Sequence, residues 1–309
     1  MALHPDLDAF LTLARDKGHP PFHTLPVEQA RALYDRTATQ LDEPSQVATS
    51  TLHFSARDGA RIQIRRYDPG DTRAALLYFH GGGYTVGGLD SHDGLCGALA
   101  ALTPCVVFAV DYRLAPEHRF PTAFFDAEDS YQWLLSQSAA LGIDPSCIAV
   151  AGDSAGGTLA TALCLNARDQ GWPPPCAQAL LYPCTSARQD SASHQRYDTG
   201  YLLEQHTLQW MFNNYLRDDS DRDDWRFSPL TTASLDGLPP AFIGLAEHDP
   251  LVDEGIAYAG RLTTAGVDTR LEIYDGMVHD FARLMRVVPE AARQVREDMA
   301  EMLAEYCAG

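Results

Sequence analysis

The sequence contains almost no lysine: of its 23 basic residues, only Lys17 is a lysine. This residue lies in a polar N-terminal stretch, directly before Gly18. Mechanisms that need a lysine are therefore nearly excluded, among them the phosphate-binding P-loop, Ser-Lys dyads and Schiff-base chemistry. A nucleophilic serine in this chain would have to be activated by a histidine.

Long apolar runs, targeting signals and metal-binding spacings are also missing. No apolar run reaches the roughly 18 residues that cross a bilayer, so we expect no membrane segment. The stretch 1–22 holds acids and prolines and does not have the pattern of a secretory signal. The seven cysteines show no C-x-x-C or zinc spacing, so we expect no bound metal and a reduced, cytoplasmic setting.

Positive charge is scarce as well. The chain carries 42 acidic and 23 basic residues, a formal net charge of −19. A surface that binds nucleic acid or an anionic membrane needs clustered lysine and arginine. We therefore expect neither as a partner.

Strand-like runs recur through the chain, and helical patterns at 121–141, 158–168, 254–265 and 289–306 accompany the later ones. The third to seventh runs are short, continuous and apolar, which is typical of strands buried on both faces of a parallel sheet. A length of 309 residues suits one large α/β domain with an accessory piece. The runs are 52–56, 61–67, 75–79, 105–112, 147–151, 177–182, 241–246 and 269–274.

Two glycine-framed motifs indicate the chemistry. Gly152-Asp153-Ser154-Ala155-Gly156 follows an apolar run and precedes a helical pattern, as in the tight strand-to-helix turn that exposes a nucleophilic serine. His80-Gly81-Gly82-Gly83-Tyr84 ends another apolar run and can direct backbone N–H groups toward a developing oxyanion. One motif supplies the attack and the other stabilises charge, so together they predict ester hydrolysis.

A serine nucleophile also needs a base and an acid. In a sheet of this kind they follow the serine in the order acid, then histidine, each on a loop at the carboxyl end of a strand. Only His248 and His279 follow a strand-like run downstream of Ser154, and His248 directly precedes Asp249, so those two neighbours cannot act as base and orienting acid. We predict a triad of Ser154, Asp249 and His279. Asp249 could instead cap the following helix, as could Asp253.

The motifs resemble those of the hormone-sensitive-lipase-like esterases (bacterial family IV) of the α/β-hydrolase fold. The resemblance runs from about residue 50 to the C-terminus and rests on 80–84, 111–121, 152–157, 248–255 and 276–281. It implies a mostly parallel eight-stranded sheet flanked by helices, with a helical cap. The G-D-S-A-G form resembles one of the family's two main subgroups.

The resemblance also implies how the site works. Gly82 and Gly83 are expected to bind the oxyanion together with the N–H of Ala155, which the elbow motif itself supplies. The expected substrates are short-chain acyl esters, hydrolysed through an acyl-enzyme without a cofactor. A formamidase or amidase using the same triad stays open as an alternative. A non-catalytic small-molecule receptor of the same fold is the other alternative, and the presence of His279 counts against it.

Two segments do not fit the strand–helix rhythm and are expected to form the cap. Residues 1–45 carry two amphipathic helical patterns, and residues 185–224 change from polar to strongly apolar. The catalytic domain would then span 46–309, with the second segment as an insertion. The run 269–274 would be the last strand of the sheet, so pairing of two copies there into a homodimer is a further hypothesis.

Three residues near the motifs have structural interpretations. We expect His80 to be held by backbone contacts and Asp153 to support the tight turn. We also expect Arg113 to pair with Glu117 and so buttress the glycine loop.

Overall fold

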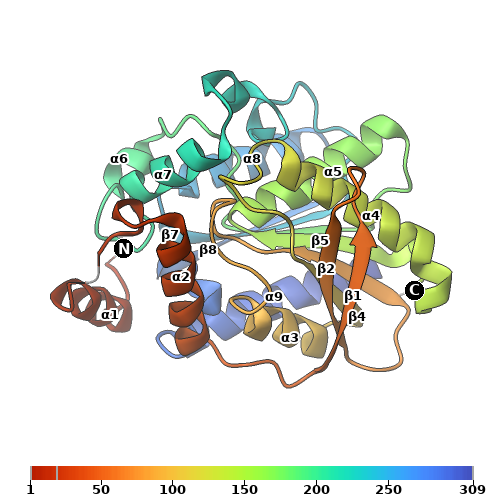
Figure 1. Ribbon diagram of the computed structural model, residues 1–309, viewed down its shortest axis with the longest axis horizontal. Helices are drawn as coiled ribbons and strands as arrows, with labels where there is room; N and C mark the ends of the chain where they lie inside the picture. The colour runs from red at the N-terminus through yellow and green to blue at the C-terminus, as the bar shows by residue number, and fades with distance from the viewer. Residues whose placement is uncertain (1, 19, 308–309) are drawn as a thin grey trace.

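A computed structural model describes residues 2–18 and 20–307, and its centre is a single eight-stranded sheet (Figure 1). The strand order is β1-β2-β4-β3-β5-β6-β7-β8. Strands β3 to β8 run parallel to one another, whereas β2 pairs antiparallel with both β1 and β4. This confirms the predicted fold class. The strands are β1 (Ala48–Ser55), β2 (Arg61–Asp68), β3 (Ala74–Phe79), β4 (Cys105–Val110), β5 (Ile148–Asp153), β6 (Gln178–Leu181), β7 (Ala241–His248) and β8 (Thr269–Val278).

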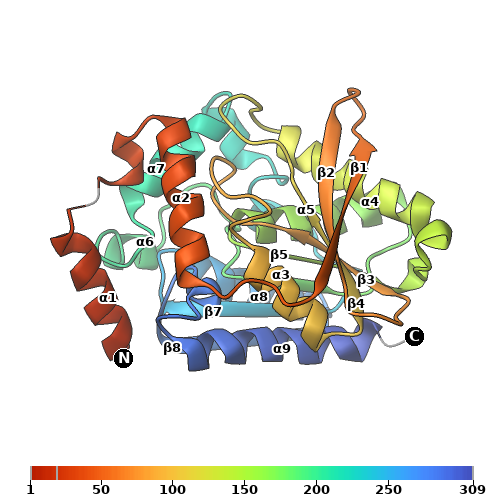
Figure 2. The same ribbon diagram turned by 60° about the horizontal axis from the view of Figure 1, so that its bottom comes forward.

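Helices cover both faces of the sheet, so its central strands are buried throughout (Figure 2). Successive side chains of a strand point to opposite faces. In β3, Leu77 and Phe79 belong to an apolar cluster that includes residues of α4, α5 and α8, while Leu76 and Tyr78 belong to a second cluster that includes residues of α3 and α9. The helices are α1 (Pro5–Asp16), α2 (Val27–Leu41), α3 (Asp93–Leu102), α4 (Thr122–Leu141), α5 (Ala155–Gln170), α6 (Ala192–Arg196), α7 (Gln205–Tyr215), α8 (Val252–Thr264) and α9 (Pro289–Cys307).

Helix α3 was not predicted by the sequence analysis. Gly94 and Gly97 lie inside it, and glycine lowers helix propensity by roughly 1 kcal/mol relative to alanine. Both glycines have a packing reason: a Cβ at Gly94 would overlap the carbonyl oxygen of Glu43, and a Cβ at Gly97 would overlap the side chain of Ser45. The connection after α2 therefore lies directly against this helix.

The two segments outside the strand–helix rhythm, 1–45 and 185–224, lie near each other (Figures 1 and 2). We call them the cap segments. Helix α2 from the first is beside α7 from the second, and an apolar cluster including Ala30 and Met211 joins them. The guanidinium of Arg31 fixes α2 to the main domain, since it donates to the carbonyl oxygens of Thr85 at 2.8 Å and Ala115 at 2.9 Å.

The prediction that Arg113 pairs with Glu117 is wrong. Arg113 forms an ion pair with the buried carboxylate of Asp126 at 2.7 Å and a second with Asp58 at 2.6 Å. Glu117 accepts instead from Arg31 of α2 at 2.7 Å. The sequence could not predict this pairing because Arg31 is 86 residues away from Glu117, whereas Arg113 is close to it in the chain.

Within the described residues, no helix is long and apolar enough to cross a membrane.

Candidate active site

Ser154 stands at the sharp turn between β5 and α5. Its φ of 52° lies in the region that a non-glycine residue rarely adopts, which is typical of a strained functional turn. The turn brings the start of α5 against β3, and a Cβ at Gly156 would overlap the carbonyl oxygen of Phe79. The second glycine of the motif is therefore required by close backbone approach. The serine side chain is left at the floor of a cavity.

The structure brings the three predicted triad residues together. His279 Nε2 lies 3.0 Å from Ser154 Oγ, and His279 Nδ1 lies 2.6 Å from Asp249 Oδ2. Asp249 follows β7 and His279 follows β8, at the carboxyl ends of neighbouring parallel strands. The other oxygen of Asp249 accepts from the N–H of Leu251 at 2.9 Å, so this carboxylate also ties down the turn before α8. Asp253 instead accepts from the N–H of Ser193 at 2.8 Å.

The electrostatics around His279 favour its protonated form. Burial alone would lower the pKa of this imidazole. The adjacent carboxylate of Asp249, with smaller contributions from Asp280 and Asp153, outweighs burial and raises the pKa of His279 above its usual value. An imidazolium formed by taking the serine proton is therefore stabilised.

The three predicted oxyanion donors surround the same cavity. Gly82, Gly83 and Ala155 line it together with Ser154. Among the described residues, none accepts a hydrogen bond from the N–H groups of these three donors. The φ values of 116° at Gly82 and 56° at Gly83 give the loop the geometry that glycine permits. Unpaired N–H groups beside a nucleophile are suited to binding a developing oxyanion.

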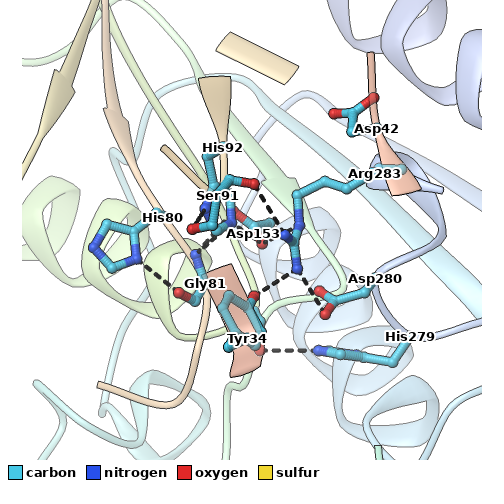
Figure 3. Close-up of polar contacts among 12 residues, drawn as sticks. Tyr34, Asp42, His80, Gly81, Ser91, His92, Asp153, His279, Asp280 and Arg283 are labelled. Carbon is cyan, nitrogen blue, oxygen red and sulfur yellow. Dashed lines mark hydrogen bonds and ion pairs between the residues drawn. The ribbon is translucent and has the colours of Figure 1, made fainter. Parts of the chain in front are cut away.

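Asp153 directly precedes the nucleophile, and its side chain lies among Gly81, His92 and Arg283 (Figure 3). Its carboxylate accepts from the N–H of Gly81 at 3.0 Å and from the hydroxyl of Tyr78 at 2.7 Å, and lies 3.2 Å from His92 Nε2. Burial alone would raise the pKa of Asp153, but His92 and Arg283 hold it below the usual value. Asp153 therefore binds the glycine loop to the strand that carries Ser154.

His80 is a structural residue of the glycine loop. Its ring stacks on Tyr112 at a centroid distance of 4.3 Å. Its Nδ1 lies 2.7 Å from the carbonyl oxygen of Gly81, a contact drawn in Figure 3. Burial, together with the neighbouring His92, lowers the pKa of His80 to about 3. The imidazole is neutral at physiological pH, and the ring that hydrogen-bonds with Ser154 Oγ is that of His279, which agrees with the sequence interpretation.

Arg283 is the main residue near the site that sequence reasoning missed. It lies in the short turn after His279, and its guanidinium is buried between Tyr34, Asp280 and Asp153 (Figure 3). The sequence offers only one signal, the i, i+3 spacing of Asp280 and Arg283, which on a surface would be an ordinary ion pair. Nothing in that spacing predicts a buried arginine.

Three cavities follow one another from Ser154 toward the surface. The innermost, about 40 Å³, holds Ser154 and the oxyanion donors. The next, about 110 Å³, is strongly apolar and shares Tyr34, Leu203, Met211 and His279 with the first. The outermost, about 450 Å³, lies between the cap helices α1 and α2 and shares Phe22 with the second. The described residues contain no group of three or more His, Cys, Asp or Glu placed to hold a metal.

Comparison with known proteins places this geometry in a family. A family model described as the alpha/beta hydrolase fold matches residues 76–283. The chain is 45% identical to an ethyl acetate hydrolase of Pseudomonas putida, over 94% of this chain and 95% of that protein. It is 37% identical to a carboxylesterase of Mycobacterium tuberculosis, over 96% of each chain.

Solved structures agree with these sequence relatives. An ester hydrolase from the metagenome of Lake Arreo, complexed with a bipyridine phosphonate derivative, superimposes with a TM-score of 0.94 at 35% identity and covers 99% of this chain and 100% of its own. A thermostable esterase from Pseudomonas putida gives a TM-score of 0.94 at 31% identity, covering 99% of this chain and 98% of its own. The chain therefore belongs to the α/β-hydrolase fold family.

Proposed function

We propose that this protein is a serine carboxylesterase that hydrolyses short-chain acyl esters through a Ser154–His279–Asp249 triad and an acyl-enzyme. The observation that carries the proposal is the continuous hydrogen-bond chain from Asp249 through His279 to Ser154 Oγ, which lies beside three N–H groups that have no acceptor among the described residues. The enzyme class rests on the near full-length relatives, which are named as ester hydrolases. The protein is a carboxylic ester hydrolase.

The reaction would proceed in two steps. His279 takes the proton of Ser154 while the serine oxygen attacks the ester carbonyl, and Asp249 stabilises the imidazolium. The N–H groups of Gly82, Gly83 and Ala155 bind the oxyanion of the tetrahedral intermediate. As the intermediate collapses, the C–O bond to the alcohol breaks and His279 gives its proton to the departing oxygen. Water then repeats the sequence on the acyl-enzyme, releasing the acid and restoring Ser154.

The cavities suggest how the two halves of the ester are held. His279 must reach the leaving oxygen, and it lines the middle cavity, which opens outward to the groove between α1 and α2. We place the apolar alcohol portion there and the acyl group in the small inner cavity, roofed by Leu208 and Met211 of α7. This favours acyl groups from acetyl to hexanoyl over longer chains. The cap segments would thus shape the site, within the proposed division into cap and catalytic domain.

The proposal also includes the subgroup, the compartment and the type of bond that is hydrolysed. The GDSAG form at 152–156 supports membership of the hormone-sensitive-lipase-like esterases and of the subgroup with that motif. The cytoplasm is the compartment that the sequence predicts. Hydrolysis of a C–N bond by the same triad is the alternative, and rates on p-nitrophenyl acetate and on an N-formyl anilide would separate the two activities.

The decisive test is Ser154→Ala. We expect kcat for p-nitrophenyl acetate to fall by on the order of 10⁶, because the nucleophile is lost while the fold is kept. Circular dichroism and thermal unfolding of the variant serve as controls for folding. A folded Ser154→Ala protein that keeps esterase activity would contradict the proposed mechanism.

A further inference from the structure

Arg283 is a buried cation at the meeting point of several elements of the site (Figure 3). Its Nη2 donates to Asp280 Oδ2 at 2.8 Å and to Tyr34 Oη at 2.5 Å. Its Nη1 donates to the carbonyl oxygen of Ser91 at 3.2 Å. Its Nε lies 4.0 Å from Asp153 Oδ2 and has no hydrogen-bond partner among the described residues. One guanidinium therefore contacts four separate segments.

Outward, this cation reaches the cap through Tyr34. Tyr34 belongs to α2, and the guanidinium lies 5.2 Å from the centre of its ring. The same tyrosine lines both the cavity that contains Ser154 and the middle cavity. Among the other polar contacts of α2, the ion pair between Arg31 and Glu117 lies nearer the surface, and the Glu117 side chain is exposed. Tyr34 is thus the contact by which α2 reaches the charges buried beside the triad.

Inward, the cation touches the sequence neighbours of the base and of the nucleophile. Asp280 directly follows His279 and has a left-handed φ of 68°. Asp153 directly precedes Ser154 and accepts from the N–H of Gly81, the residue before the oxyanion donors. Without Arg283, both carboxylates would remain near the imidazole with less compensating charge, and an uncompensated buried charge is strongly destabilising.

We propose that Tyr34 and Arg283 form a latch that couples the seating of α2 to the loop that carries His279. With α2 seated, the Tyr34 hydroxyl fixes the guanidinium, which in turn fixes Asp280 and the backbone next to the base. With α2 displaced, this constraint is lost and the triad is no longer held in its working geometry. Tyr34 and Arg283 are then positioning residues: they act through His279 and not on the ester. The inference rests on the proposed triad.

Tyr34→Phe tests the latch while keeping the aromatic ring. We expect kcat to fall about tenfold with little change in KM, because the seated population declines once a hydrogen bond to a charged group is lost. Amide hydrogen exchange in the peptide covering 27–41 should become faster, which reads the latch without any activity measurement. Glu117→Gln is the matched control, since it removes the negative charge of the exposed ion pair on the same helix and should leave kcat unchanged.

A pH profile separates this role from a purely structural one. Asp280→Asn, which tolerates the left-handed backbone, should move the acid limb of kcat/KM to lower pH, because one carboxylate that favours the imidazolium is gone. Arg283→Met should move it to higher pH, and Arg283→Lys, which keeps the charge, should return it toward wild type. The charged and titratable groups of the surrounding elements that face His279 or its loop are Asp249, Asp280, Asp153, Arg283, Tyr34 and Tyr182.

The outcomes are distinct. Slower turnover with faster exchange in α2, together with opposite shifts for Asp280→Asn and Arg283→Met, supports the latch. Wild-type kcat in Tyr34→Phe, or a lower kcat without faster exchange, overturns it, as does an acid limb that stays fixed in Asp280→Asn. If Arg283→Met does not fold, the other variants decide the matter. Esterase activity that survives Ser154→Ala would instead contradict the proposed function. In that case, amide exchange in residues 27–41 would still measure how firmly α2 is docked.

Discussion

At the scale of single residues, Asp249 combines two tasks that the sequence presented as alternatives. One oxygen contacts His279 and the other accepts from the N–H of Leu251 at the turn before α8. We expect Asp249→Asn to lower kcat by about 10⁴, because an amide favours the wrong imidazole tautomer. Its side-chain oxygen can still accept from Leu251, so the unfolding midpoint in urea should change little. A large loss of stability would show that the fold depends on the carboxylate itself.

Glu254, in the first turn of α8, gives a pH prediction for stability. Its Oε1 accepts from the N–H groups of Thr185 at 2.6 Å and Ser186 at 3.0 Å, while Oε2 has no hydrogen-bond partner in the described chain. Burial raises the pKa of Glu254 to about 8. The folded state therefore keeps a proton that the unfolded state releases above about pH 4.5, so stability falls as pH rises from there toward 8.

Glu254→Gln should remove this dependence. Its amide oxygen can accept the same two backbone bonds, and it carries no titrating group. Between pH 5 and 8, the free energy of unfolding of the wild type should fall relative to the variant by up to about 4 kcal/mol. Urea unfolding at several pH values measures the difference. The exposed Glu117 offers the control, because its hydrogen bond with Arg31 lowers the pKa of this carboxyl. Glu117→Gln should therefore alter the pH dependence of the free energy of unfolding only slightly, and with the opposite sign. A constant gap between wild type and Glu254→Gln would contradict the shift.

At the scale of elements, the cap segments are where the structure adds most to the sequence. Asp42, just after α2, forms an ion pair with the buried guanidinium of Arg296 at 2.8 Å. Deleting residues 1–45 would leave that buried cation without its carboxylate partner. Such a truncation would therefore test stability more than substrate choice. Removing residues 1–20 is the better change, because α1 buries only Leu7 and Leu11 and forms one wall of the outer groove.

We expect the protein without residues 1–20 to keep its turnover of acetate esters of short alcohols while losing any preference for acetate esters of longer linear alcohols. The reason is that the groove on the His279 side loses a wall, whereas the inner cavity does not. A series of acetate esters from ethyl to octyl measures the alcohol preference. A parallel series of acyl chains on one alcohol is the control and should be unchanged. An unaltered alcohol series would show that α1 does not shape the site.

The elements differ in how far the sequence could predict them. The central strands are apolar along their whole length, so burial on both faces made them easy to identify, and the chain order of the motifs then brought Ser154, Asp249 and His279 to neighbouring loops. Helix α3 was missed because its glycines serve packing against Glu43 and Ser45. Arg283 was missed because a buried charge depends on partners far apart in sequence. Periodicity reports burial, whereas it does not report which distant side chains meet.

At the scale of the whole molecule, the open sheet has two edge strands, β1 and β8, and β8 is the one through which two copies could associate. Among the strands of the described chain, β8 is the last and pairs only with β7. Arg270 on this strand forms ion pairs with Glu272 and with Glu301 of α9, and such charged pairs protect an edge. Ile273, on the opposite face of the strand from Arg270 and Glu272, nevertheless remains 41% exposed. The ion pairs of Arg270 therefore oppose pairing of two edges, whereas the exposed Ile273 favours it.

We expect a homodimer formed through β8, with twice the 33.9 kDa mass of the chain in light scattering at micromolar concentration. Because each copy carries a net charge of −19, the dimer should be favoured by salt, which screens the repulsion. Ile273→Lys should give a monomer, since it places a further charge on the edge. Ile256→Lys is the matched control: Ile256 of α8 is equally exposed at 41%, and its substitution should leave the dimer intact. A wild-type protein with the mass of one chain at all salt concentrations would contradict pairing through β8, and the ion pairs of Arg270 would then serve only to protect the edge.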